Sequence, residues 1–155
     1  MEIRPFVPED AEETAALIAG TLRKVNIKDY DPAYIERIVS SHSAEDLIRT
    51  ASEGHLYVAC EEGEILGCGA VTPPAENGGA AWLQTVFVRD GYLGRGIGRR
   101  LMETLEGDEI SLSAGRTELA ASVTAKDFYR RLGYSFRDGK EEPDEGQVFR
   151  MEKRV

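Results

Sequence analysis

The sequence contains few of the residues that carry metal or disulfide chemistry. It has two cysteines and two histidines in 155 residues, and neither histidine has neighbours in a metal-ligand spacing. Cys60 and Cys68 flank a predicted hairpin turn at residues 61–64, and the register of that hairpin places Cys60 near Ile65 and Cys68 near Tyr57. Because the two thiols then do not oppose each other, we predict two small buried side chains, no disulfide and no metal site.

The chain also lacks long apolar runs and an excess of basic residues. No stretch approaches the roughly 20 apolar residues of a membrane-spanning helix, and the first residues show no signal-peptide pattern. The net charge is −9, from 19 basic and 28 acidic residues. This balance disfavours nucleic acids and anionic membranes as partners. We therefore expect a single domain, residues 1–155, in the cytoplasm.

Apolar residues recur with a helical period in some segments and alternate in others. Helices are predicted at residues 8–25, 31–39, 43–54, 96–114 and 124–132, and strands at 2–7, 56–60, 65–71, 82–88, 117–121, 134–137 and 148–154. The third of these helices carries Leu47, Ile48 and Ala51. Thr124 is expected to cap the last helix, and Gly107 to be a weak point in the long one at 96–114. The order mixes hairpins with strand–helix–strand crossovers, which predicts an α/β fold with a mixed sheet and helices on both faces.

The most informative segment is rich in glycine. Gly94, Arg95, Gly96, Ile97 and Gly98 follow a predicted strand and begin a predicted helix. Glycine lets the backbone approach a ligand and adopt positive φ, and the N–H groups of such a turn and of a helix N-terminus bind anions. Four arginines and one aspartate lie within residues 89–100 of this acidic chain. The segment therefore predicts a site for a phosphorylated ligand.

Two common nucleotide-binding motifs do not match these glycines. A Walker A loop requires a lysine followed by serine or threonine after its last glycine, and no such pair follows here. The dinucleotide motif Gly-x-Gly-x-x-Gly would require glycine where Arg99 stands. In addition, residues 90–93 separate the strand from the glycines by more than that fold allows.

The glycine segment instead resembles the Arg/Gln-x-x-Gly-x-Gly/Ala motif of the GNAT superfamily of N-acetyltransferases, which binds the pyrophosphate of acetyl-coenzyme A. A second segment, residues 125–134, is similar to the superfamily's Ala-x-x-Phe-Tyr-x-x-x-Gly-Phe/Tyr pattern. Leu93 stands where the first motif has arginine or glutamine, and Ser122 stands where asparagine is common. The resemblance extends over nearly the whole chain and implies a mostly antiparallel sheet of about seven strands.

The resemblance also implies which residues bind and react. Acetyl-CoA is the implied cosubstrate, contacted by Val86, Phe87, Val88, Leu93, Gly94, Arg95, Gly96, Ile97, Gly98, Arg99 and Ser122. The backbone of residues 86–88 would pair with the pantetheine arm as an added strand, and the N–H of Val86 would polarise the thioester carbonyl. Tyr129 matches the family tyrosine near the sulfur, where its phenol would act as general acid.

The implied reaction is direct attack of a primary amine, on a small molecule or a peptide, on the thioester of acetyl-CoA. The predicted central strand contains no carboxylate, and the facing of Glu118 on the neighbouring strand is open, so a water relay is our hypothesis for the base. The acceptor pocket is expected at residues 26–34, 72–80 and 138–146. Two alternatives are a non-catalytic acyl-CoA-binding or regulatory module of the same fold, and a nucleotide-binding interaction domain. The resemblance is compatible with a homodimer.

Overall fold

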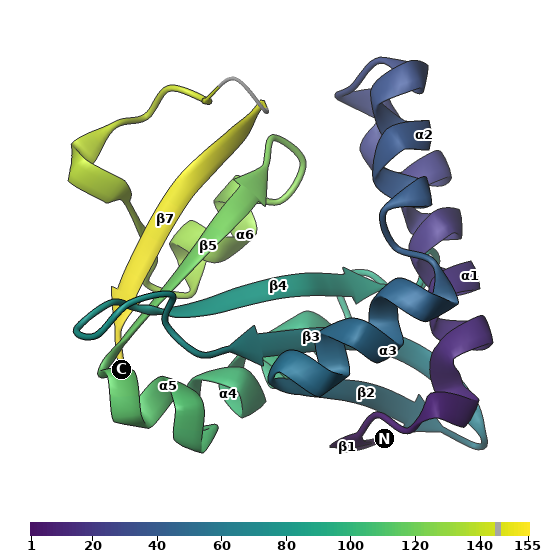
Figure 1. Cartoon of the computed structure of the whole chain (residues 1–155). Helices are drawn as coiled ribbons and strands as arrows, with labels where there is room; N and C mark the ends of the chain where they lie inside the picture. Colours follow the sequence, from purple (N-terminus) through teal and green to yellow (C-terminus); the bar gives the residue numbers. More distant parts are fainter. Residues whose placement is uncertain (145–146) are drawn as a thin grey trace.

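A computed structural model describes residues 1–144 and 147–155 (Figure 1). Glu145 and Gly146, which belong to the predicted acceptor loop at 138–146, lie outside the described residues. Among the described residues, no helix is both long and apolar enough to span a bilayer.

A seven-stranded sheet runs through the molecule in the order β1-β2-β3-β4-β5-β7-β6. The strands are β1 (Glu2–Pro5), β2 (His55–Glu61), β3 (Glu64–Thr72), β4 (Ala81–Val88), β5 (Arg116–Ser122), β6 (Ser135–Phe136) and β7 (Val148–Arg154). Every neighbouring pair is antiparallel except β4 and β5, which run parallel. This topology confirms the predicted mixed, mostly antiparallel sheet.

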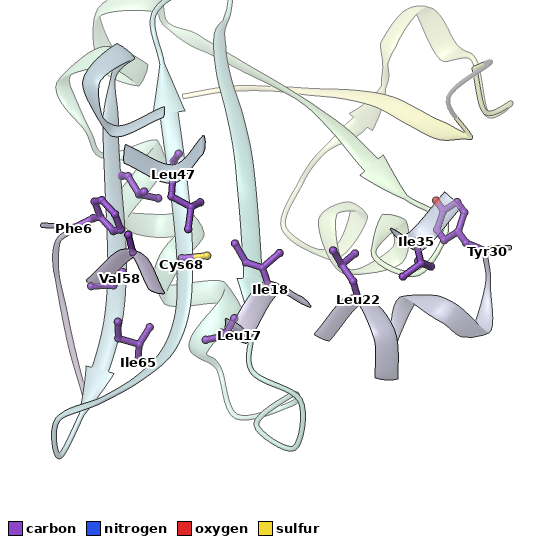
Figure 2. Close-up of a cluster of buried hydrophobic side chains, with 13 residues drawn as sticks. Phe6, Leu17, Ile18, Leu22, Tyr30, Ile35, Leu47, Val58, Ile65 and Cys68 are labelled. Atoms are coloured by element: carbon purple, nitrogen blue, oxygen red, sulfur yellow. The ribbon is translucent and has the colours of Figure 1, made fainter. Parts of the chain in front are cut away.

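Helices cover both faces of the sheet (Figure 1). They are α1 (Ala11–Lys24), α2 (Pro32–Ser40), α3 (Ala44–Glu53), α4 (Ile97–Glu106), α5 (Glu109–Ala114) and α6 (Lys126–Arg131), with short 3-10 turns η1 (Pro8–Asp10), η2 (Asn26–Lys28) and η3 (Arg137–Gly139). Helices α1 and α3 share one hydrophobic cluster with β2 and β3 (Figure 2). On the opposite face, α4 and α6 share another cluster with β4, β5 and β7.

Local sequence signals explain the start of α3 but not all of its packing. The Ser43 side chain accepts a hydrogen bond from the Asp46 N–H at 3.2 Å, and Asp46 Oδ2 accepts one from the Ser43 N–H at 2.9 Å. This reciprocal capping box fixes the first turn. Leu47 is buried in the core, whereas the Ile48 side chain is 42% exposed beside the apolar stripe.

The predicted long helix at 96–114 is two helices. Gly107 ends α4, and Asp108 begins α5 by accepting a hydrogen bond from the Ile110 N–H at 2.9 Å. The Asp108 side chain is only 2% exposed and also accepts hydrogen bonds from the Tyr57 hydroxyl at 2.6 Å and from His55 Nδ1 at 2.8 Å. These contacts with β2 hold Asp108 in an N-cap position, which a continuous helix would not allow.

The hairpin of β2 and β3 differs from its predicted register by one residue. Cys60 lies opposite Ile65, as predicted, but Cys68 lies opposite Val58 and not near Tyr57. A bulge between Ala59 and Cys60 inserts the extra residue. Both thiols are free, and Cys68 is fully buried.

Candidate functional site

The central strand β4 carries a bulge at Thr85. Gln84 lies opposite Ala70 and Phe87 lies opposite Cys68, so Thr85 and Val86 together face the single residue Gly69. Thr85 has a φ of 60°, in the left-handed region that side chains rarely adopt. Since facing alternates along a strand, the extra residue reverses the pattern beyond it. Phe87 therefore packs toward α1, while Val86 belongs to the cluster beneath α4.

Beyond this bulge, β4 separates from β5. Pairing between them covers only Ala81–Leu83 and Thr117–Leu119, and the two strands diverge beyond it (Figure 1). The Arg89 N–H donates to the Leu66 carbonyl of β3 at 2.8 Å. Because backbone groups alternate sides along a strand, the N–H groups of Val88 and Val86 point away from β3, toward β5.

One of the backbone groups on this side of β4 is already occupied. The Val88 carbonyl accepts a hydrogen bond from the Thr21 hydroxyl of α1 at 2.8 Å. The groups left facing β5 are the N–H and carbonyl of Val86 and the N–H of Val88. Two donors flanking one acceptor match an extended chain that carries amide groups, as a third strand would.

The predicted glycine loop lies where β4 leads into α4. Gly94 and Gly96 have φ of 79° and 82°, and Gly96 is the N-cap of α4. The backbone N–H groups of residues 93–99 donate to no other described residue. A Cβ at Gly94 or Gly96 would meet no atom within 4 Å and would project into open space. Free N–H groups at a helix start, with room beside them, fit a pyrophosphate.

The other residues of the loop have different surroundings. Ile97 is buried and anchors the loop, whereas Leu93 is 53% exposed. A Cβ at Gly98 would lie 3.0 Å from the ring of Phe128, so this glycine lets α6 pack closely on α4. Gly98 therefore also serves the packing of α6 against α4.

The four arginines of the segment are not equivalent. Arg89 donates from Nε and Nη2 to the Ile65 carbonyl at 2.9 and 2.7 Å, and Arg100 donates to the Met1 carbonyl at 3.4 Å. Arg95 lies over the Tyr92 ring, 4.8 Å from its centroid. Arg99 lines a cavity of about 170 Å³ together with Arg131 and Lys153. Arg95 and Arg99 thus remain as the cations available to an anion at the loop.

The second motif places Tyr129 against the core of the same half of the sheet. The residue is 7% exposed, and its ring contacts those of Phe128 and Tyr134, with centroids 5.1 and 5.9 Å away. No other described residue forms a hydrogen bond with its hydroxyl. Burial raises the pKa of Tyr129 well above its ordinary value, so the phenol keeps its proton at neutral pH.

The turn between β5 and α6 departs from the prediction. Ser122 Oγ accepts a hydrogen bond from the Ala125 N–H at 3.1 Å, which leaves its own proton free to be donated. The prediction that Thr124 caps α6 was wrong: α6 follows an Ala125 N-cap, and the Thr124 hydroxyl donates to Asp29 Oδ2 at 2.7 Å. This contact with the segment that joins α1 to α2 keeps the Thr124 side chain from capping α6.

Sequence reasoning did not single out Tyr30, which joins three distant segments. Its hydroxyl accepts a hydrogen bond from the Val123 N–H and donates one to the Gln147 carbonyl, both at 2.8 Å. Figure 2 shows the ring beside the end of β5. Because Val123 and Gln147 lie far from Tyr30 in the chain, no local sequence pattern indicates these hydrogen bonds.

The structure places the three predicted acceptor segments in two locations. Burial raises the pKa of the Tyr34 phenol, and the nearby Asp144 carboxylate raises it further. Together with the contact between Tyr30 and Gln147, this brings parts of segments 26–34 and 138–146 toward each other. Segment 72–80 instead lines another cavity, of about 640 Å³, with residues of α5.

The register settles the facing of Glu118. Its neighbours Thr117 and Leu119 are buried, so Glu118 points to the opposite face, beside Trp82. One of its carboxylate oxygens lies 3.0 Å from Arg137 Nη1. Tyr129 belongs to the cluster on the other face. Glu118 therefore lies across the sheet from the predicted general acid and is already paired with a cation.

Comparisons with known proteins agree with this architecture. The sequence matches the family model of an acetyltransferase (GNAT) domain over residues 52–136, more than half of the chain. No curated protein matches it. A GCN5-related N-acetyltransferase structure from Rhodopseudomonas palustris is 22% identical, with a TM-score of 0.83 over 99% of this chain and 95% of that one.

Two further solved structures have the same fold. The PaiA N-acetyltransferase from Thermoplasma acidophilum, in complex with coenzyme A, is 21% identical, with a TM-score of 0.80 over 99% of this chain and 98% of that one. A ribosomal-protein-alanine N-acetyltransferase from Brucella melitensis is 19% identical, with a TM-score of 0.71 over the full length of both chains.

Proposed function

The chain belongs to the GNAT family of acetyltransferases, and we propose that it transfers the acetyl group of acetyl-CoA to a primary amine of a small molecule or a peptide. Acetyl-CoA-dependent acyl transfer is the chemistry of the family. The observation that carries the proposal for this chain is the separation of β4 from β5 directly before a glycine cradle with free N–H groups. The gap between the separated strands would receive the pantetheine arm, and the glycine cradle that follows would receive the pyrophosphate.

The cosubstrate is proposed to bind along the whole of this surface. The N–H groups of residues 93–99 and the side chains of Arg95 and Arg99 would hold the pyrophosphate. The pantetheine arm would then extend beside residues 86–88, with Ser122 donating from the β5 side. The exposed side chain of Leu93 leaves the loop backbone free to bind, so the missing polar side chain of the motif does not block the site.

The chemistry requires stabilisation of two charges. As the amine attacks, negative charge develops on the thioester oxygen, and a fixed backbone N–H at Val86 would stabilise it without reorganisation. The leaving thiolate then needs a proton, and the phenol of Tyr129, which is protonated at neutral pH, would supply it. Water is proposed to take the proton from the incoming ammonium, because Glu118 lies on the other face and is paired with Arg137.

Calorimetric titration is expected to show acetyl-CoA binding to the unmodified protein. The free N–H groups of the loop and its two available arginines would supply most of the affinity through charge-assisted hydrogen bonds. ATP and NAD serve as comparison ligands because they also carry phosphates. Binding of ATP or NAD alone, or no binding of acetyl-CoA at millimolar concentration, would contradict the proposal.

The substitution Gly96→Ala is expected to weaken CoA binding about tenfold, equivalent to about 1.4 kcal/mol. A methyl group at this positive φ would strain the backbone and project into the space beside the free N–H groups. The matched control is Gly63→Ala in the hairpin turn, where φ is 79° and the Cβ also meets open space. Calorimetry should show normal CoA affinity for this control, and equal weakening in both variants would count against the cradle.

A further inference from the structure

We propose that Cys68 is a positioning residue for acetyl transfer: its thiol holds the β4 bulge in the conformation that turns the Val86 N–H toward the gap between β4 and β5. The inference rests on the proposed role of the Val86 N–H in polarising the thioester. Cys68 is a buried residue of β3, the strand next to β4, and this residue touches neither the glycine loop nor Tyr129.

The thiol contacts the bulge on both sides of Val86. Cys68 is 0% exposed, and its Sγ donates a hydrogen bond to the Thr85 carbonyl at 3.2 Å. The Phe87 N–H faces the same sulfur. Figure 2 shows the sulfur directed from β3 toward β4. One side chain therefore engages the residue before Val86 and the residue after it.

The bulge needs such a partner for two physical reasons. A non-glycine residue with the φ of Thr85 carries backbone strain, which surrounding contacts must offset. A bulge also takes backbone groups out of the regular ladder, and a buried carbonyl without a donor is costly. The thiol of Cys68 provides that donor for Thr85 within an otherwise apolar cluster.

The protonation state of the thiol supports this role. Burial raises the pKa of Cys68 to about 12, although the Phe87 N–H offsets part of that rise. The proton consequently stays on sulfur throughout the neutral range, and the thiol remains a donor.

Packing on the other face restricts the bulge as well. Gly69 is the residue opposite Thr85 and Val86, and a Cβ there would lie 3.0 Å from Leu105 Cδ1 and 3.6 Å from Val86 Cγ2. The absence of a side chain at Gly69 makes room for Val86 beneath α4. The bulge is thus fixed by a missing side chain on one face and by the Cys68 hydrogen bond on the other.

Isotope-edited infrared spectroscopy of bound acetyl-CoA, labelled with ¹³C at the thioester carbonyl, tests the proposal without an acceptor. In the unmodified protein, the Val86 N–H should shift the carbonyl band to lower frequency than in free acetyl-CoA. Cys68→Ala, which removes the donor, should lose most of this shift while its CoA affinity stays within twofold. Cys68→Ser, which restores a donor, should keep most of the shift. Cys60→Ser, at the other cysteine, is the matched control and should keep it entirely.

Turnover with an amine acceptor gives an independent comparison. We expect Cys68→Ala to lower kcat by about 10- to 100-fold, because a small displacement of a fixed donor is costly, with KM for acetyl-CoA nearly unchanged. A purely structural role would make the infrared shift and kcat follow thermal stability, so that Cys68→Ser would lose as much as Cys68→Ala. That result, or a full shift in Cys68→Ala, would overturn the inference. Failure of the unmodified protein to bind acetyl-CoA would instead refute the proposed function.

Discussion

The substitution Tyr129→Phe is expected to lower kcat by about 10²-fold, with KM for acetyl-CoA and the free energy of unfolding nearly unchanged. The phenol would supply the proton that the leaving thiolate needs, and phenylalanine cannot. Since no other described residue forms a hydrogen bond with this hydroxyl, the fold loses no interaction when it is removed. The measurement is release of free CoA with the best acceptor from a panel of primary amines, together with thermal unfolding.

A second buried tyrosine provides the matched control. The Tyr134 hydroxyl donates to Glu106 Oε2 at 2.8 Å and lies 2.9 Å from the Thr117 hydroxyl, in a network that also includes Lys153. Tyr134→Phe should therefore lower the free energy of unfolding by about 1–2 kcal/mol and leave kcat unchanged. Both variants remove one phenolic oxygen from the same apolar cluster. If Tyr129→Phe loses stability and keeps its rate, then Tyr129 is a core residue and the general acid lies elsewhere.

Removal of the Asp108 carboxylate is expected to cost about 3 kcal/mol of unfolding free energy. In Asp108→Ala, the Tyr57 hydroxyl and the Ile110 N–H lose their buried acceptor, and α5 loses its cap. Glu109→Gln is the control, because that carboxylate is exposed and lies 4.0 Å from His55 Nε2. An exposed pair of this kind contributes little. Chemical denaturation should separate the two variants, and similar stabilities for both would contradict this account.

The contribution of Asp108 should also depend on pH. Burial alone would raise the pKa of Asp108, but hydrogen bonds from Tyr57, Ile110 and His55 outweigh burial and hold the pKa below its ordinary value. A carboxylate with a lowered pKa in the folded state stabilises that state above its ordinary pKa, and loses this effect as the pH falls. The stability difference between the unmodified protein and Asp108→Asn should therefore be largest near neutral pH and shrink below about pH 4. A difference that stays constant from pH 7 to pH 3 would contradict this explanation.

Much of the architecture could be predicted because its signals are local. The capping box at Ser43 and Asp46, the proline and aspartate at the start of α2, and the alternating residues of β4 each act within a few positions. The glycine loop could also be predicted, since positive φ and a helix start are properties of adjacent residues. For the same reason, the prediction for Tyr129 rests on a short motif of neighbouring residues, 125–134.

The errors share a different cause, which is competition from distant partners. Asp108 divides the predicted long helix because His55 and Tyr57 on β2 bind it. Thr124 does not cap α6 because Asp29 takes its hydroxyl. Cys68 was recognised as a small buried residue, but its hydrogen bond to Thr85 depends on the register of two strands. These contacts join residues that are far apart in the chain, so they leave no periodic pattern in the sequence.

The sequence by itself determined most of the helices and strands, the mixed sheet and the position of the glycine loop, because local backbone preferences and hydrophobic periodicity specify them. Only the tertiary structure decided where β4 bulges, which way the N–H groups of Val86 and Val88 point, and which face carries Glu118. A single extra residue in one strand reverses the facing of every residue beyond it, and the position of that residue is set by packing against α4, α1 and β3. The loop proposed to bind the cosubstrate is thus encoded locally, whereas the geometry that would polarise its thioester depends on contacts across the sheet.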